Sequence, residues 1–162
     1  MKSVQHLRID NENELKDFKY YFSNATTLTL QNNFSSTPNL ITINLNHVIS
    51  SNQLIKLVVE RTKLSLTQLI ELLHCTPYIH TLVFESIPLY GVNYNFIQQN
   101  QYFQLVPSTN VTFKEKCTLE KLQILVTLYS QIQHLTIRLR EKNLKSYVRF
   151  LLEKTNRNTN PI

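Results

Sequence analysis

Apolar residues recur along the chain in one short pattern: an apolar residue, two spacers, an apolar residue, one spacer and an apolar residue. An alternating segment of this kind predicts a β-strand that buries one face. The third residue of the pattern lies two positions after the central one, on the same side of the strand. The pattern occurs five times in full and once in part, at Val111 and Phe113. Its central residues are Leu7, Leu28, Leu57, Leu82, Val111 and Leu135.

Successive central residues are separated by 21, 29, 25, 29 and 24 positions, which leaves room for a helix that returns between parallel strands. The most similar segments are Ser65–Phe84 and Thr118–Ile137, offset by 53 residues. Each reads as a helix cap, an amphipathic helix, a turn and a strand. Two segments that match in both helix and strand positions indicate an internal repeat.

Helical spacing of apolar residues predicts the return segments at Asn13–Phe22, Leu40–Ile49, Ser65–Cys75, Tyr94–Val106, from Thr118 onward, and Asn143–Lys154. Caps are expected at Asp10 or Asn11, at Ser65 with Gln68, and at Thr118. In the first helix Leu15, Phe18 and Tyr21 share one face. In the last helix the residues expected to point inward are Leu144, Tyr147, Val148, Leu151 and Leu152.

The segment Leu40–Leu45 also fits the strand pattern, so Leu40–Ile49 is either a helix or an extra strand. A strand there would leave spacings of only 15 and 14 residues, which are short for a strand with its return helix. We therefore interpret it as a helix with Ile41, Leu45, Val48 and Ile49 toward the core.

These elements predict an α/β fold: a solenoid of about six strand–helix units with a parallel sheet on its concave face. Residues 1–154 form a single domain, and residues 155–162 form a polar tail.

Composition restricts the chemistry. Gly91 is the only glycine, which excludes a glycine-rich phosphate loop. Cys75 and Cys117 are too far apart in sequence for a zinc site built from cysteine pairs, and we expect both to be small buried residues. No metal or cofactor is expected. A secretory signal and a membrane-spanning run are missing from the sequence, which favours an intracellular protein without membrane contact.

Alternation along the strands sends the residues between the apolar positions outward, in three columns. The first contains His6, Thr27, Lys56, Thr81, Asn110 and His134. The second contains Arg8, Thr29, Val58, Val83, Thr112 and Thr136. The third contains Asp10, Gln31, Glu60, Glu85, Lys114 and Arg138.

The residues expected to bind a partner lie in the later strands of these columns: Lys56, Val58, Glu60, Thr81, Val83, Glu85, Thr112, Lys114, Thr136 and Arg138. Val58 and Val83 form an apolar spot. Glu60 and Glu85 are neighbours, and a cationic partner would relieve their repulsion; alternatively, both splay into water with Lys56 close by.

The net charge of +6 suits an acidic partner or simply keeps the chain soluble. A second hypothesis is nucleic-acid binding through the basic C-terminal helix face, within the basic stretch Arg138, Arg140, Lys142, Lys145, Arg149, Lys154 and Arg157. Glu141 and Glu153 interrupt this basic run. None of the histidines has a carboxylate or nucleophile at a spacing that suggests catalysis, so we do not expect an enzyme.

The strand spacing and the intervening helices resemble the leucine-rich repeat superfamily of ribonuclease-inhibitor type. The segment Leu72–Leu82 is similar to the cysteine-containing repeats of F-box substrate receptors: Cys75, Ile79 and Leu82 match, and Thr76 intrudes before Pro77. The asparagine that usually follows the strand in this superfamily is missing from most units.

This resemblance implies a horseshoe that recognises another protein on its concave face, as a monomer and without chemistry of its own. It further suggests the substrate-recognition part of a ubiquitin ligase receptor. The helical F-box module that docks onto the ligase would have to lie upstream of Val4, so this chain is expected to be either a fragment or a bare recognition domain.

Overall fold

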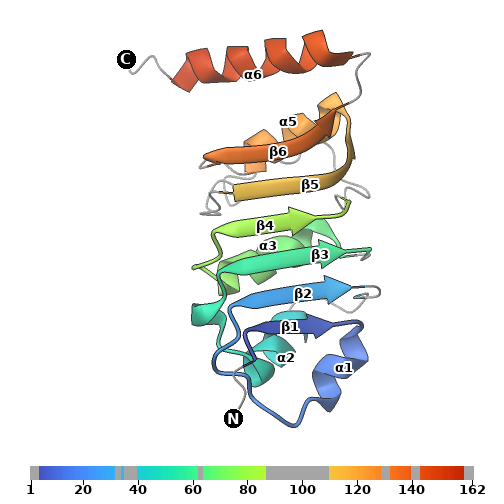
Figure 1. Ribbon diagram of the computed structural model, residues 1–162, viewed down its shortest axis with the longest axis vertical. Coiled ribbons are helices and arrows are strands. Elements are labelled where there is room, and N and C mark those ends of the chain that lie inside the picture. Colours follow the sequence, from blue (N-terminus) through green and yellow to red (C-terminus); the bar gives the residue numbers. More distant parts are fainter. Residues whose placement is uncertain are drawn as a thin grey trace.

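Six parallel strands form a single sheet in the computed structural model, which describes residues 4–31, 34, 40–61, 64–86, 110–128, 132–139 and 143–158. The strands lie side by side in the order in which they occur in the sequence (Figure 1). They are β1 (His6–Ile9), β2 (Thr27–Gln31), β3 (Lys56–Glu60), β4 (Thr81–Phe84), β5 (Asn110–Cys117) and β6 (His134–Leu139). The predicted α/β class and the six predicted strands are therefore confirmed.

The central apolar residues of the six strands stand in one row across the sheet. Leu7 pairs with Leu28, and the row continues through Leu57, Leu82, Val111 and Leu135. Leu28, Leu57 and Leu82 are fully buried. Because a strand alternates its side chains between two faces, this row fixes which residues of every strand point away from the core.

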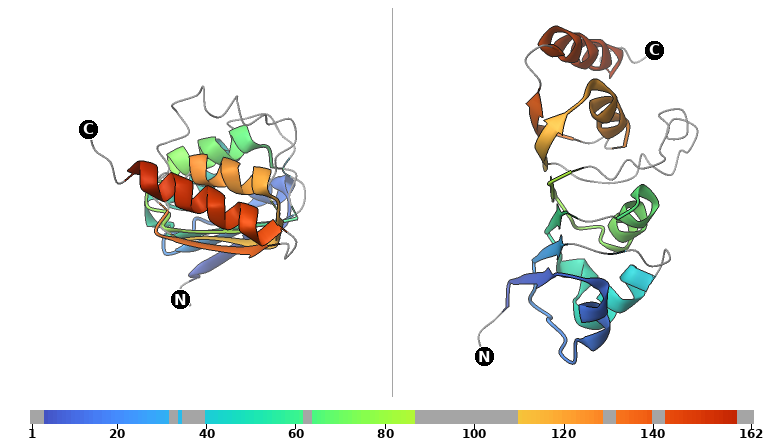
Figure 2. Two further views of the ribbon diagram at one scale, coloured as in Figure 1. Left: turned by 90° about the horizontal axis from the view of Figure 1, so that it is seen from above. Right: turned by 90° about the vertical axis from the view of Figure 1, so that its right-hand side faces the viewer.

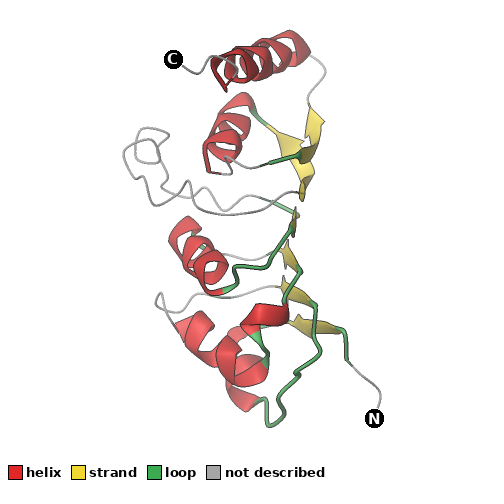
Figure 3. Cartoon of the chain, turned by 90° about the vertical axis from the view of Figure 1, so that its left-hand side faces the viewer, coloured by secondary structure: helices red, strands yellow, loops and turns green. Residues whose placement is uncertain are grey.

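Five described helices and a short 3-10 turn connect or follow the strands. They are α1 (Glu12–Asp17), α2 (Leu40–Val48), the 3-10 turn Ser51–Gln53, α3 (Leu66–Cys75), α5 (Leu119–Leu128) and α6 (Leu144–Asn158). Views from the two sides show these helices on the same side of the sheet (Figures 2 and 3). The core lies between the helices and the row of strand leucines, and the opposite side of the sheet carries no described element.

Predicted caps begin three of these helices. Ser65 and Gln68 form a reciprocal capping box at α3, with the Ser65 hydroxyl accepting from the Gln68 backbone N–H at 3.2 Å. The Asn11 side chain accepts from the backbone N–H groups of Asn13 and Glu14 at the start of α1. At α5 the Thr118 hydroxyl accepts from Lys121 N–H at 3.3 Å. Each side chain satisfies a helix N–H that has no partner within its own helix.

The first helix is shorter than predicted. Phe18 has an extended backbone, with φ −63° and ψ 117°, and ends α1 after Asp17. Phe18 and Phe22 still pack against the core, in an edge-to-face contact with 5.7 Å between ring centroids. Tyr21 is exposed, so the prediction that it shares the buried face was wrong.

The segment Leu40–Ile49, which the sequence allowed to be a helix or an extra strand, forms a helix. Residues Leu40–Val48 form α2, and Leu45, Val48 and Ile49 are buried as predicted. The helix predicted at Tyr94–Val106 lies outside the described residues.

Helix α6 packs on the core through fewer residues than predicted. Tyr147 is fully buried, and its hydroxyl donates a hydrogen bond to the carbonyl oxygen of Cys117 at 2.8 Å. Leu151 is partly buried. Leu144, Val148 and Leu152 are exposed, so the prediction that they point inward was wrong. Because residues three and four apart share a helix face, Tyr147, Phe150 and Leu151 contact the core and the other three project to one side. The helix runs to Asn158, past the boundary predicted at residue 154.

Loss of the α3 cap should destabilise the whole array. We expect Ser65→Ala to lower the free energy of unfolding by about 1 kcal/mol, because the Gln68 N–H loses its acceptor. Thr67→Ala, at an exposed position in the first turn of the same helix, is the matched control and should change stability by less than about 0.5 kcal/mol. Urea denaturation followed by circular dichroism measures both. Equal effects of the two substitutions would contradict the cap.

Candidate functional site

The side of the sheet that faces away from the helices is one surface to which all six strands contribute. We call it the open face, and it consists of the outward residues of β1 to β6. The strand register places His6, Thr27, Lys56, Thr81, Asn110 and His134 in one row, and Arg8, Thr29, Val58, Val83, Thr112 and Thr136 in the next. The first two predicted columns are confirmed as structural rows. Their role in binding stays a prediction.

The side chains in the middle of the open face are more buried than predicted. Val58 is only 9% exposed and Thr29 only 4%, while Val83 is partly buried. Each lies between side chains of the two neighbouring strands, because parallel strands are only about 4.8 Å apart. The prediction of an exposed apolar spot at Val58 was therefore wrong. Across β1 and β2, the His6 Nε2 atom lies 2.8 Å from the Thr29 hydroxyl, which ties the two rows together.

Charged residues line the edge of the open face where the strands end; we call this the carboxyl edge. Lys114 Nζ lies 3.3 Å from Glu60 Oε1, and Arg61 Nε lies 3.6 Å from Glu85 Oε2. At the first strands, Arg8 pairs with Asp10 at 3.0 Å and donates a hydrogen bond to the Gln31 side chain. The acidic groups of this edge are thus matched by cations of the same chain.

These ion pairs correct two expectations. Glu60 and Glu85 each have a cation of this chain as a partner, so their proximity is no argument for a cationic ligand. Lys56 was expected to compensate them, whereas Lys114 and Arg61 do so. Arg61 was not predicted to be the partner of Glu85, because it adopts φ 48°, a left-handed conformation that is uncommon for a residue other than glycine.

The third predicted column is broken at its last strand. The register between β5 and β6 shifts between Thr112 and Lys116, so Arg138 pairs with Lys116 instead of following Lys114. An irregularity of this kind inserts extra residues into one strand. The irregularity accompanies a difference in strand length: β5 has eight residues, whereas β4 has four.

Three cations of the open face have no ion-pair partner among the described residues. The ion pairs of these residues involve none of Lys56, Lys116 and Arg138, and all three are exposed. Thr136 is exposed, and Thr81 and Thr112 are partly buried beside them. The open face therefore offers hydroxyl groups and positive charge on a rigid sheet.

The cysteines differ from each other. Cys117 is buried as predicted, but Cys75 is exposed, so the prediction of a buried Cys75 was wrong. The buried face of α3 includes Leu69, Leu72 and Leu73 and continues to Thr76, whose hydroxyl donates to the Leu72 carbonyl at 2.7 Å. Thr76, which precedes Pro77, thus takes the inward position that was expected for Cys75.

The described residues contain no group of three or more histidine, cysteine, aspartate or glutamate side chains that could hold a metal ion. Within the same residues, no helix is both long and apolar enough to cross a membrane. The open face holds histidines at its two outermost strands, β1 and β6, and these cannot act together.

Comparisons with protein-family models, with curated proteins and with solved structures returned no match.

The two thiols should react at different rates. Burial raises the pKa of Cys117 from 9.0 to about 11, opposed by the nearby Lys121 and assisted by Glu115. The thiolate is the reactive form, so a maleimide at pH 8 should label Cys75 rapidly and Cys117 only on unfolding. Mass spectrometry of the labelled peptides measures this, and equal labelling of the native protein would contradict the described burial.

The same pKa shift gives a pH dependence of stability. Because the folded pKa of Cys117 is raised, its contribution is present below pH 9 and is lost as the pH rises through about 11. Relative to Cys117→Ala, the native chain should lose stability across that interval, as seen in urea midpoints. A constant difference between the two proteins from pH 8 to pH 11 would show that the thiol does not titrate there.

The carboxyl-edge pair between Glu60 and Lys114 should be weak. Both side chains are partly exposed, at 25% and 49%, and pairs in such positions couple by less than about 1 kcal/mol. A double-mutant cycle with Glu60→Gln and Lys114→Met, measured by urea denaturation, should give a small coupling that falls with added salt. A coupling above about 2 kcal/mol would contradict the solvent-exposed geometry.

Proposed function

We propose that this chain is a protein-interaction module of leucine-rich-repeat type that binds a protein partner on the open face of its sheet. One observation carries the proposal: the described helices lie on one side of a six-stranded parallel sheet, so the outward residues of every strand are presented together (Figure 2). A sheet with one covered and one free face is a ready platform for a partner. In the repeat superfamily that the sequence resembles, this surface is the concave wall of a horseshoe.

The partner that fits this surface is a protein with an acidic contact patch. Lys56 and Arg138 have no ion-pair partner in the described residues, and the chain carries a net charge of +6. Complementary charge speeds association and discriminates against cationic partners. Thr81, Val83, Thr112 and Thr136 supply hydroxyl and apolar contacts between these cations, whereas Glu60, Glu85 and Lys114 shape the rim through their internal pairs.

A role as the substrate-recognition part of an F-box-type ubiquitin ligase receptor rests on the resemblance of Leu72–Leu82 alone. The exposed position of Cys75 departs from a buried repeat cysteine. We therefore place the proposal at the level of protein recognition, with a ubiquitination substrate as one class of partner.

Nucleic-acid binding through α6 has less support. Arg149 is paired with Glu153 at 3.1 Å, and Tyr147 is fully buried, so it offers no surface for base stacking. Arg140 and Lys142 lie outside the described residues. This alternative requires binding to RNA or DNA that falls steeply with salt.

The test uses a photo-cross-linking amino acid at Thr112 on the open face, with Thr67 on the exposed side of α3 as the matched position. A partner that binds the open face should be captured from Thr112 and not from Thr67. With the captured protein purified, Lys56→Glu combined with Arg138→Glu should weaken its binding at least about tenfold, because both charges become repulsive.

Lys16→Glu combined with Lys19→Glu, an equal double charge reversal at exposed residues in and just after α1, is the control and should leave affinity within about twofold. Capture from Thr67 instead, or full binding by the Lys56 and Arg138 variant, would contradict the open-face assignment.

A further inference from the structure

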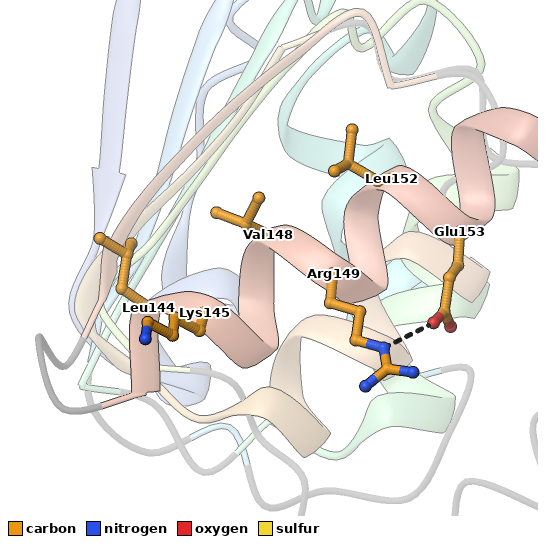
Figure 4. Close-up of a pocket in the computed structure, with 6 residues that line it drawn as sticks. All are labelled: Leu144, Lys145, Val148, Arg149, Leu152 and Glu153. Carbon is orange, nitrogen blue, oxygen red and sulfur yellow. Dashed lines mark hydrogen bonds and ion pairs between the residues drawn. The ribbon is translucent and has the colours of Figure 1, made fainter.

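Helix α6 carries an apolar ridge that no other described residue of the chain covers. Leu144, Val148 and Leu152 are 51%, 47% and 59% exposed. They are spaced four residues apart and therefore form one continuous ridge along the helix. A second ridge, one residue further on, consists of Lys145, Arg149 and Glu153. Figure 4 shows the apolar ridge and the charged ridge projecting from different sides of the helix, with the Arg149–Glu153 ion pair drawn.

A shallow groove of about 470 Å³ runs between these two ridges and is lined by these six residues. All of them belong to one helix, so the groove has no walls that would enclose a small molecule. The groove is the space between two adjacent ridges, each of which consists of residues four apart in the sequence. In the commonest class of helix packing, a ridge of another helix fills this space.

The end of the core beneath α6 is also incompletely covered. Leu135, Ile137 and Leu139 of β6 are only partly buried, whereas the equivalent Leu28, Leu57 and Leu82 are fully buried. At the other end of the sheet, Leu7 is 6% exposed and Ile9 is fully buried under α1. Other large apolar residues that are exposed, namely Val4, Tyr20, Tyr21, Ile55 and Tyr78, are spread over the rest of the described residues, whereas Leu144, Val148 and Leu152 lie together on one helix.

The charges beside the groove favour one particular occupant. In an antiparallel pair of α6 helices related by a two-fold axis near Val148, Leu144 of each copy lies near Leu152 of the other. The flanking ridges then run in opposite directions, so Lys145 of each copy lies near Glu153 of the other. The two Arg149 side chains meet near the axis, and each is already paired with Glu153 of its own chain at 3.1 Å. The apolar ridge is thus self-complementary, and so are the charges at its ends.

We infer that α6 is the contact surface of a homodimer, in which the apolar ridge of each copy packs into the groove of the other. Two ridges of this type interdigitate at an interaxial angle of about −50°. The stems of Lys145 and Arg149 cover the outer side of each inserted ridge. Three apolar side chains from each copy make a small interface, so the dimer is in concentration-dependent exchange with the monomer. This replaces the expectation of a monomer, and it does not depend on the proposed function because the open face takes no part in it.

Sedimentation velocity of the full chain from low micromolar to millimolar concentration tests the inference. The native chain should shift from monomer to dimer across this range. Val148→Arg should raise the dimer dissociation constant at least about tenfold, because it places two like charges at the centre of the contact. Ile55→Arg is the matched control: Ile55 is 48% exposed, close to the 47% of Val148, but it lies at the start of β3 and should leave dimerisation unchanged.

Charge exchange tests the antiparallel geometry. Glu153→Lys should weaken the dimer, and the double variant Lys145→Glu with Glu153→Lys should recover it, because each new glutamate again faces a lysine of the second copy. Thermal unfolding of every variant checks that these exposed substitutions leave the fold intact.

A chain that stays monomeric at millimolar concentration would overturn the inference and leave the ridge to a partner of different sequence. Dimers that Val148→Arg does not affect would overturn it by placing the contact elsewhere. Failure of the double variant to recover dimerisation would overturn the antiparallel arrangement.

Discussion

The structure depends on one repeated contact, the in-register pairing of six parallel strands whose central apolar residues form a single buried row. The inner leucines of this row, Leu28, Leu57 and Leu82, are held between neighbouring strands and the helices behind them. A truncation such as Leu57→Ala would leave a cavity and cost about 2–5 kcal/mol, a large part of the stability of a domain of this size. Because a unit cannot bury its own apolar face alone, the row makes the units interdependent. It also fixes, by alternation, every residue of the open face.

The two ends of this row differ, and this difference separates the two surfaces that we assign. Under α1 the row is closed by Ile9 and Leu15, both buried. Under α6 only Tyr147 is fully buried, held by its hydrogen bond to Cys117, and the β6 residues remain partly exposed. We therefore propose recognition of another protein at the open face and self-association at the α6 end, which belong to different layers of the structure.

Much of the fold was predictable because the apolar pattern of parallel strands is local. The residues of each strand pattern, with the cap residues Asn11, Ser65 and Thr118, specify strands and helix starts within a few positions. The choice between helix and strand at Leu40–Ile49 also followed from spacing, since a parallel neighbour needs room for a return segment. The assignment of outward residues followed from the same alternation.

What could not be predicted depends on contacts between distant residues. Helical spacing places Leu144, Val148 and Leu152 next to the buried face of α6, but only the packing of Tyr147 shows how far that face extends. The pairing of Glu60 with Lys114 joins residues 54 apart in the sequence. The shift between β5 and β6 likewise depends on two strands together.

Distances between spin labels at the ends of the first row test the strand order most directly. In a Cys75→Ser background, labels at His6 and His134 should be separated by about 24 Å, because five strand spacings of about 4.8 Å lie between them. Moving the first label to Thr27 and then to Lys56 should shorten the distance by about one spacing each time. A series that does not shorten in this order would contradict the single parallel sheet on which both surfaces depend.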